Sequence, residues 1–183
     1  MLVVNLFAGP GAGKTTLRAL IFAELKMAGG GLDVEEAIEV AKEHVRERRE
    51  VALGNRIQIL GDQFHRVFRL EGQVDVVVND SPVLLNGVYA AREGWPRCYA
   101  DLCRWAHDRH ESLNVWVERR REHGFQQAGR REAEAACLDL DAEIRGMLDR
   151  ERIAHMVASS GYEGARQVAA AVLERVRGLR GAA

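Results

Sequence analysis

The sequence has few of the residues that build disulfide scaffolds, metal clusters or membrane spans. Its three cysteines, Cys98, Cys103 and Cys137, form no CxxC pair and no spacing typical of a zinc site. A scattered, odd-numbered set of this kind is typical of a reducing compartment. No apolar run approaches the ~20 residues that a bilayer requires, and the apolar start MLVVNLFAG lacks the basic segment of a targeting sequence. We therefore expect a soluble cytoplasmic protein with no membrane partner.

The sequence also lacks an excess of charge of either sign. It has 26 lysines and arginines against 27 aspartates and glutamates, which gives a formal net charge of -1. A nearly neutral chain has no general field that draws it to nucleic acid or to an anionic surface. Any binding of a polyanion must therefore depend on a local basic patch.

Apolar runs alternate along the chain with stretches of helical periodicity. The 183 residues fit one domain, 1–183, because no linker, repeat or low-complexity segment divides them. Short apolar runs predict strands at 2–7, 34–38, 74–78, 113–118 and 153–159. Amphipathic spacing predicts helices at 14–27, from 41, 57–70, 99–109, 130–150 and 164–179, and the whole of 34–47 is also compatible with a helix. This alternation predicts an α/β fold, a three-layer sandwich with a central parallel sheet.

A glycine-rich loop joins the first expected strand to the first expected helix, in the stretch LFAGPGAGKTTL. Glycines let the backbone wrap around phosphate with its amide groups pointing inward at a helix N-terminus. In this P-loop motif Lys14 supplies a positive charge to the β- and γ-phosphates, and the Thr15 hydroxyl is a ligand for Mg²⁺. Ala8 replaces the usual first glycine, which changes only the first corner of the loop. The motif predicts a P-loop NTPase that binds ATP and Mg²⁺, with the nucleotide on Gly9, Pro10, Gly11, Ala12, Gly13, Lys14, Thr15 and Thr16.

Two acidic residues follow strands that end at the same edge of the expected sheet. Asp80 comes directly after VDVVVN, where we expect it to be catalytic and, with Thr15, to bind the metal. The other interpretation is that Asp80 caps the turn before Pro82. Glu39 could accept a proton from the acceptor or hold it, or it could be one solvated charge among several. The strand ends in Asn-Asp-Ser-Pro, with no adjacent glutamate to activate water, which argues against an ATPase.

An arginine-rich segment, about 118–131, separates the fourth expected strand from the long helix that follows. Phosphoryl transfer is favoured by cations that close over the moving group and by exclusion of water. We therefore expect a lid in which Arg130 is catalytic and Arg119 and Arg121 contact the substrate. The other interpretation is a solvated charged loop.

A polar pair lies on the helix predicted at 57–70. Gln63 and Arg66 are three residues apart, so they are neighbours on the helix surface and could hold a base edge and a phosphate. Taken alone, the pair is more typical of an ordinary polar helix surface. The apolar side of the same helix is expected to carry Ile57, Leu60, Phe64, Val67 and Phe68.

Five segments of the sequence occur in the same order in a known group of kinases. They are GPGAGKTT, EVAKE, QILGDQFHRVFRL, VDVVVNDSPVLL and the AGR before the long helix. With these segments the chain resembles thymidylate-kinase-like P-loop kinases of bacteriophages, particularly the 5-hydroxymethyldeoxyuridine DNA kinases of phages with hypermodified thymine. The resemblance implies transfer of the ATP γ-phosphate to the hydroxymethyl group of 5-hydroxymethyluracil in DNA, in the cytoplasm of the host cell. It also implies ATP at residues 9–16, Asp80 at the catalytic centre, Glu39, Gln63 and Arg66 facing the acceptor, and Arg130 in the lid.

Two other functions are compatible with the residues. A deoxynucleoside monophosphate kinase would use the same lid and acids, and the lack of a broadly basic chain keeps a free deoxynucleotide open as the partner, because phosphate contacts supply most nonspecific DNA affinity. A target base inside a duplex would also have to be flipped out or presented single-stranded. A P-loop ATPase or switch is the third function, against which the missing Asp-Glu pair and the arginine-rich segment count. The DNA-base kinase is our first expectation.

Overall fold

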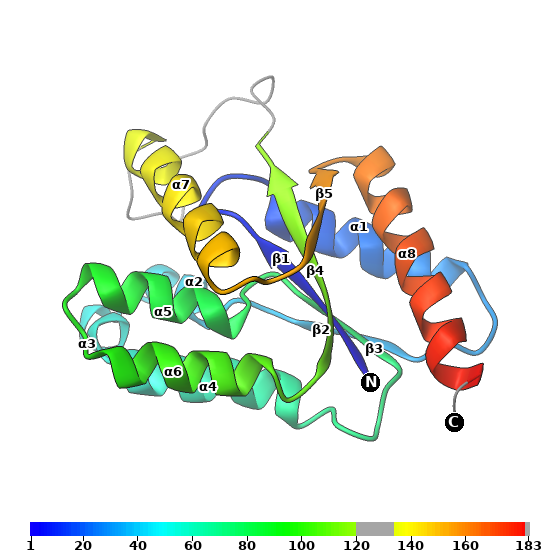
Figure 1. The fold of residues 1–183 in the computed structure, drawn as a ribbon, viewed down its shortest axis with the longest axis horizontal. Coiled ribbons are helices and arrows are strands. Elements are labelled where there is room, and N and C mark those ends of the chain that lie inside the picture. Colours follow the sequence, from blue (N-terminus) through cyan, green and yellow to red (C-terminus); the bar gives the residue numbers. More distant parts are fainter. Residues whose placement is uncertain (120–133, 182–183) are drawn as a thin grey trace.

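The computed structural model describes residues 1–119 and 134–181 (Figure 1). Within them, five strands form one parallel sheet in the order β2-β3-β1-β4-β5. The strands are β1 (Leu2–Phe7), β2 (Val34–Ala37), β3 (Val76–Asn79), β4 (Glu111–Glu118) and β5 (His155–Ser159). The predicted α/β fold with a central parallel sheet is confirmed.

Helices cover both faces of this sheet (Figure 1). In chain order the described helices are α1 (Lys14–Met27), α2 (Val40–Arg46), α3 (Glu50–Gly54), α4 (Arg56–Phe68), α5 (Val83–Arg92), α6 (Arg97–His107), α7 (Glu134–Arg150) and α8 (Tyr162–Gly181). Leu2, Val4 and Leu6 of β1 pack toward α1 and α8. Val3 packs toward α4 and Phe7 toward α5 and α7, because successive side chains of a strand point to opposite faces. The sheet is therefore the middle layer of the expected three-layer sandwich.

Two helices, α3 and α5, were not predicted from the sequence. α5 begins directly after Pro82, where the segment NDSP indicates a turn, and its residues Leu84, Leu85 and Val88 enter the apolar core against α7. α3 has only five residues, too few to show helical periodicity. Both helices lie close to the carboxyl edge of the sheet, so their absence from the prediction affects the site.

The predicted apolar side of α4 is partly wrong. Leu60 and Val67 are buried as expected, but Ile57 is 66% exposed and Phe68 is 42% exposed. The buried stripe includes Ile59 and the polar Gln63 instead. It is rotated because α4 packs against both the sheet and α5, so its contact surface faces two neighbours.

The remaining boundaries agree with the sequence to within a few residues, except at the start of α7. The predicted helix 130–150 is described from Glu134 onward, and its first residues lie outside the described part. Among the described residues, no helix is both long and apolar enough to cross a membrane.

Candidate active site at the carboxyl edge of the sheet

The loop between β1 and α1 has the backbone conformation of a phosphate-binding loop. Gly11 and Gly13 adopt left-handed φ angles of 80° and 94°, which favour glycine. Gly13 also abuts the loop after β5, since a Cβ atom on it would lie 2.6 Å from Ser160 Cβ. No side chain caps the N-terminus of α1, so the amide groups of its first turn are available to an anion. This geometry fits the phosphates of ATP.

Lys14 is half-buried at the start of α1. Its ammonium group donates to the backbone oxygens of Ala8 at 2.6 Å and Gly9 at 3.0 Å. Burial lowers the pKa of Lys14, and the carboxylates of Glu39, Asp80 and Asp141 act in the opposite direction. The lysine therefore lies among three carboxylates that come from different parts of the chain.

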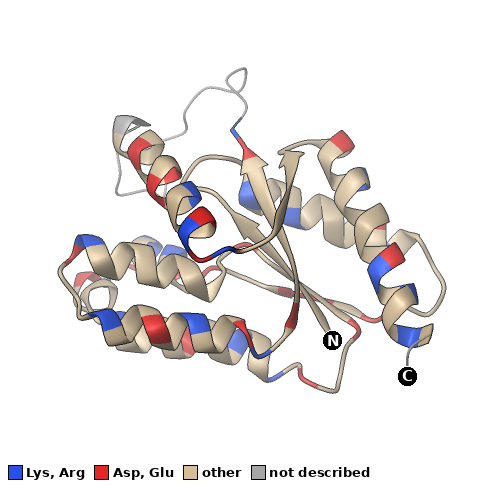
Figure 2. Cartoon of the chain, viewed as in Figure 1, with Lys and Arg blue, Asp and Glu red and all other residues tan. Residues whose placement is uncertain are grey.

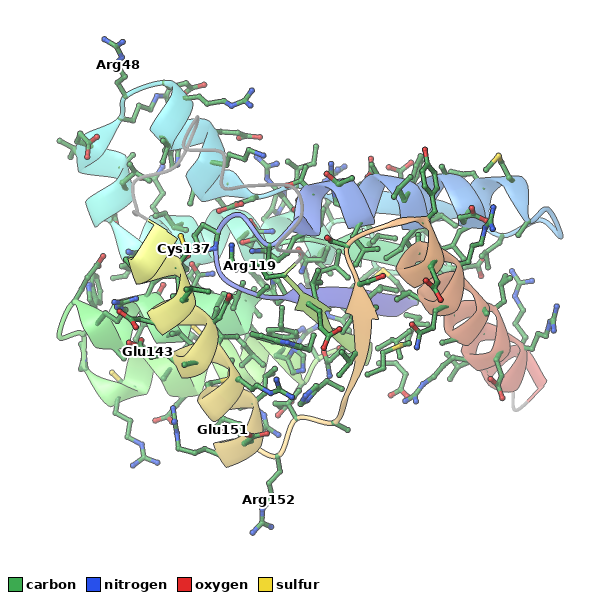
Figure 3. The ribbon with its side chains drawn as sticks, turned by 90° about the horizontal axis from the view of Figure 1, so that it is seen from above. Arg48, Arg119, Cys137, Glu143, Glu151 and Arg152 are labelled. Carbon is green, nitrogen blue, oxygen red and sulfur yellow. The ribbon has the colours of Figure 1, made fainter. Side chains whose placement is uncertain are left out.

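The first corner of the loop is held by α7 and by the end of β4. Asp141 of α7 accepts a hydrogen bond from the Gly9 amide at 2.5 Å and one from Arg119 Nε at 2.9 Å. Arg119 Nη2 also donates to the backbone oxygen of Pro10 at 2.9 Å. A Cβ atom on Gly9 would lie 2.8 Å from Asp141 Oδ1 and 2.9 Å from the backbone oxygen of Cys137. Glycine at position 9 thus permits α7 to contact the loop. Arg119 and Cys137 are labelled beside the loop in Figure 3.

A cavity of about 430 Å³ opens in front of the loop. It brings together four of the residues predicted to act in the reaction: Lys14, Thr15, Glu39 and Asp80. Its other lining residues come from the loop and the start of α1, from the turn after β3 and from α2 to α5: Pro10, Gly11, Gly13, Thr16, Ala41, Lys42, Val45, Arg46, Leu53, Arg56, Ile59, Ser81, Leu85, Asn86 and Tyr89. The cavity therefore joins a phosphate-binding half to a half with apolar, aromatic and basic side chains.

Thr15 and Asp80 offer a hydroxyl and a carboxylate to a metal ion. Asp80 is buried, and its Oδ1 atom has no hydrogen-bond partner in the described part of the chain. Lys42 of α2 reaches the same place, with its Nζ atom 3.5 Å from Thr15 Oγ1. Mg²⁺ usually binds to only one or two protein oxygen atoms, because waters and phosphate oxygens of the substrate fill its other coordination positions. The donor set fits the expected metal.

The side of the cavity away from the loop contains residues that the sequence did not single out. Arg56 donates through two nitrogens to the carboxylate of Glu93, with Nε 2.8 Å from Oε2. Its guanidinium lies over the ring of Tyr89, 5.3 Å from the centroid. The buried Asn86 lies one helical turn before Tyr89 on α5. The signal for Asn86 and Tyr89 was the helical spacing after NDSP, which the turn residues obscured.

Gln63 and Arg66 lie where α4 contacts its neighbours α2 and β3. Gln63 is 1% exposed and accepts from the Val40 amide at 3.1 Å, while its Nε2 atom donates to Asn79 Oδ1 at 3.4 Å. Arg66 pairs with Glu43 at 2.6 Å. Neither residue lines the cavity, because α4 turns this face toward α2 and β3 and the residues at its amino end toward the site.

Most of the predicted lid, 118–131, lies outside the described residues. Arg121 and Arg130 lie outside the described residues, and only Arg119 at the end of β4 is described. Arg119 was expected to contact the substrate, and its described contacts are with the phosphate loop and Asp141.

No family model and no curated protein sequence matches the chain. Among solved structures it is similar to a NadR protein in complex with NAD and AMP-PNP, with a TM-score of 0.66 and 17% identity over 97% of this chain and 49% of that chain. A NadR protein in complex with NR gives a TM-score of 0.65 and 16% identity over 95% of this chain and 51% of that chain. The shikimate kinase of Aquifex aeolicus gives a TM-score of 0.48 and 11% identity over 97% and 98%. The chain thus spans about half the length of the NadR chains, and the likeness to them shows that it shares their α/β fold.

Proposed function

We propose that the protein is an ATP-dependent kinase that transfers the γ-phosphate to a hydroxyl group. The observation that carries this proposal is the single cavity shared by the phosphate loop, with Lys14 and Thr15, and the two carboxylates Glu39 and Asp80. A carboxylate beside the loop can take the proton of an acceptor hydroxyl. The fold supports the proposal, because one of the similar structures carries the ATP analogue AMP-PNP.

The chemistry follows from the placement of these groups. The loop amides and Lys14 would hold the β- and γ-phosphates, and Thr15 and Asp80 would hold Mg²⁺, which when bound neutralises phosphate charge. The acceptor hydroxyl would give its proton to Asp80 or Glu39 as its oxygen forms the new bond to the γ-phosphorus. The bond from that phosphorus to the bridging oxygen breaks, and ADP leaves. A lid over residues 118–131 would exclude water from this transfer.

The acceptor that we propose first is the hydroxymethyl group of 5-hydroxymethyluracil in DNA. The resemblance of five ordered segments to the phage DNA kinases supports it. Basic and acidic residues are interspersed along the described helices (Figure 2). DNA affinity would therefore come from a local patch, and Lys42 and Arg46 at the cavity are basic side chains that could contribute to one.

The second candidate is a kinase of free deoxynucleoside monophosphates. The cavity favours it, because about 430 Å³ is in the range of small-molecule sites and is far less than a bound duplex would need. α2, α3 and α5 all contribute lining residues. A base flipped out of DNA would also have to enter this space.

The experiment uses γ-labelled ATP and Mg²⁺ with three acceptors offered separately. They are DNA containing 5-hydroxymethyluracil, the same DNA with thymine, and free deoxynucleoside monophosphates. Label confined to the hydroxymethyl DNA supports the first candidate, and label on the free nucleotide supports the second. Release of phosphate to water alone would contradict both and favour an ATPase. Asp80→Asn is the matched control for transfer that depends on the site.

A further inference from the structure

A buried arginine links the predicted catalytic carboxylate to the second strand. Arg18 lies one helical turn after Lys14, on the same side of α1. Its Nε atom is 3.4 Å from Glu36 Oε1 of β2 and 3.5 Å from Asp80 Oδ2 at the end of β3. Only 9% of the Arg18 side chain and 2% of the Asp80 side chain are exposed. One guanidinium is therefore shared by two carboxylates from adjacent strands.

The geometry of this cluster differs from that of a closed ion pair. Arg56 makes a two-pronged contact with Glu93, with one N–O distance of 2.8 Å. Arg18 is within ion-pair distance of both carboxylates but forms no hydrogen bond with either. Its Nε and Nη1 atoms, Glu36 Oε1 and Asp80 Oδ1 are buried without a hydrogen-bond partner among the described residues. Buried polar atoms are normally paired. These four atoms, close to the phosphate loop, can therefore still form hydrogen bonds, and the two carboxylate oxygens among them can also bind a metal ion.

We propose that Arg18 is a positioning residue for Asp80 and that Glu36 holds Arg18 in place. The guanidinium attracts Asp80 through Oδ2 and keeps the carboxylate at the loop, where it is close enough to act on the charge of Lys14. The Oδ1 atom keeps its lone pairs for Mg²⁺ or for the acceptor hydroxyl. Glu36 prevents Arg18 from closing a two-pronged pair with Asp80 that would occupy both oxygens. This inference rests on the proposed role of Asp80.

The first test measures binding rather than activity. Isothermal titration calorimetry gives the Kd of ATP with and without Mg²⁺, and the ratio of the two is the metal-dependent gain in affinity. We expect Asp80→Asn and Arg18→Met each to reduce this gain by roughly tenfold, with a smaller change in the Kd of metal-free ATP. Arg18→Lys should restore part of the gain, because it keeps the charge, and Glu36→Gln should reduce it less than Arg18→Met.

A double-mutant cycle separates positioning from a general charge effect. If Arg18 acts through Asp80, the variant with both Arg18→Met and Asp80→Asn should lose no more of the gain than Asp80→Asn alone. The control is Arg166→Met, which removes an arginine of α8 whose Nε lies 3.6 Å from Glu24 Oε1 of α1 but whose side chain is 74% exposed. Additive losses, or an unchanged gain in Arg18→Met, would overturn the proposal. Arg18→Lys and Glu36→Gln carry the same cycle if Arg18→Met fails to fold.

A kinetic measurement distinguishes this proposal from the proposed function. With an acceptor in hand, Arg18→Met should lower kcat about 10- to 100-fold while the KM for ATP at saturating Mg²⁺ changes much less. A fall confined to the KM for ATP would overturn the positioning role. If the wild-type protein transfers phosphate to no acceptor while the binding cycle behaves as expected, the kinase proposal fails and the link between Arg18 and Asp80 stands.

Discussion

Lys14 is the residue most directly tied to the proposed nucleotide binding. Burial lowers the pKa of its ammonium group, against the attraction of carboxylates such as Glu39 and Asp80. Replacing Lys14 with Ala removes the cation that would meet the β- and γ-phosphates, so we expect ATP affinity to fall about tenfold or more. Calorimetry measures the change. Lys26→Ala, on the exposed end of the same helix where Lys26 pairs with Asp33 at 3.7 Å, should leave the affinity unaltered.

Asp80 and Glu39 are the two candidates for the group that takes the acceptor proton. Asp80 is the more buried and lies directly beside the loop, so we expect Asp80→Asn to reduce kcat by about 10²–10⁴ while ATP still binds. Glu39 precedes the first residue of α2, and Glu39→Gln should have a smaller effect on kcat. Single-turnover rates with labelled ATP compare the two variants. Wild-type turnover in Asp80→Asn would exclude its catalytic role.

Gln63 links two elements that carry the predicted acids. Its side-chain amide accepts a hydrogen bond from the backbone of Val40, the first residue of α2 and the neighbour of Glu39. It donates a hydrogen bond to Asn79, the residue before Asp80. Gln63→Met keeps the volume and removes both bonds, so we expect the free energy of unfolding to fall by about 1–3 kcal/mol. Urea denaturation measures this, and the Kd of ATP should stay within the wild-type range. Unchanged stability with a raised KM for the acceptor would instead support the substrate contact inferred from the sequence.

At the scale of elements, the loop and α7 form a close contact at Gly9. A methyl group there would press on Asp141 and on the Cys137 backbone oxygen, so Gly9→Ala must move α7 or distort the loop. We expect a loss of about 1–3 kcal/mol in unfolding free energy together with weaker ATP binding. Gly61→Ala is the matched control, because nothing lies within 4 Å of a Cβ at this position inside α4. It should stabilise the protein by about 0.5–1 kcal/mol, and equal losses in both variants would contradict the contact.

Among the elements, sequence periodicity predicted β1 and α1 but not the buried face of α4 or the existence of α5. β1, the loop and α1 are contiguous, so one motif specified their order and the place of Lys14 and Thr15. α4 has neighbours on two sides, and its apolar residues alone did not reveal which of them α4 would bury. Gln63 therefore looked like a surface residue, although it enters the core beside Asn79. α5 was obscured by the turn residues before it, and Asn86 and Tyr89 were missed with it.

At the scale of the whole molecule, the sequence predicted which strand ends meet but not which side chains join them. Parallel strands bring their carboxyl ends to one edge, so Glu39 and Asp80 were expected near the loop. Asp141 is 132 residues from Gly9, and no local pattern connects them. Arg18 is likewise joined to Glu36 and Asp80 only by the order β2-β3-β1 of the sheet. Such contacts depend on topology and side-chain packing, which cannot be predicted from the local patterns of a single sequence.

The stability of the whole fold should depend on His107 in mildly acid solution. His107 is buried at the end of α6, with its ring edge-on to Phe7 at a centroid distance of 6.5 Å. Burial lowers the pKa of His107 from its usual 6.5; nearby Asp108 opposes the shift, and Arg104 and His110 add to it. Between the folded pKa and 6.5 the unfolded chain therefore binds more protons than the native protein. The free energy of unfolding should be highest above pH 6.5 and fall as the pH drops through that window.

The variant His107→Gln isolates this contribution, because glutamine is neutral in both the folded and the unfolded state. Urea denaturation of the wild-type protein at pH 7.5 and at pH 5.5 should show a loss of stability that is smaller in the variant. Asp75 does not affect this comparison. Its pKa is lowered from 3.8, chiefly by a hydrogen bond from the Asp33 amide, so its contribution to the free energy of unfolding is lost only at a pH below this range. Equal pH dependence in the two proteins would show that His107 becomes protonated in the fold without cost.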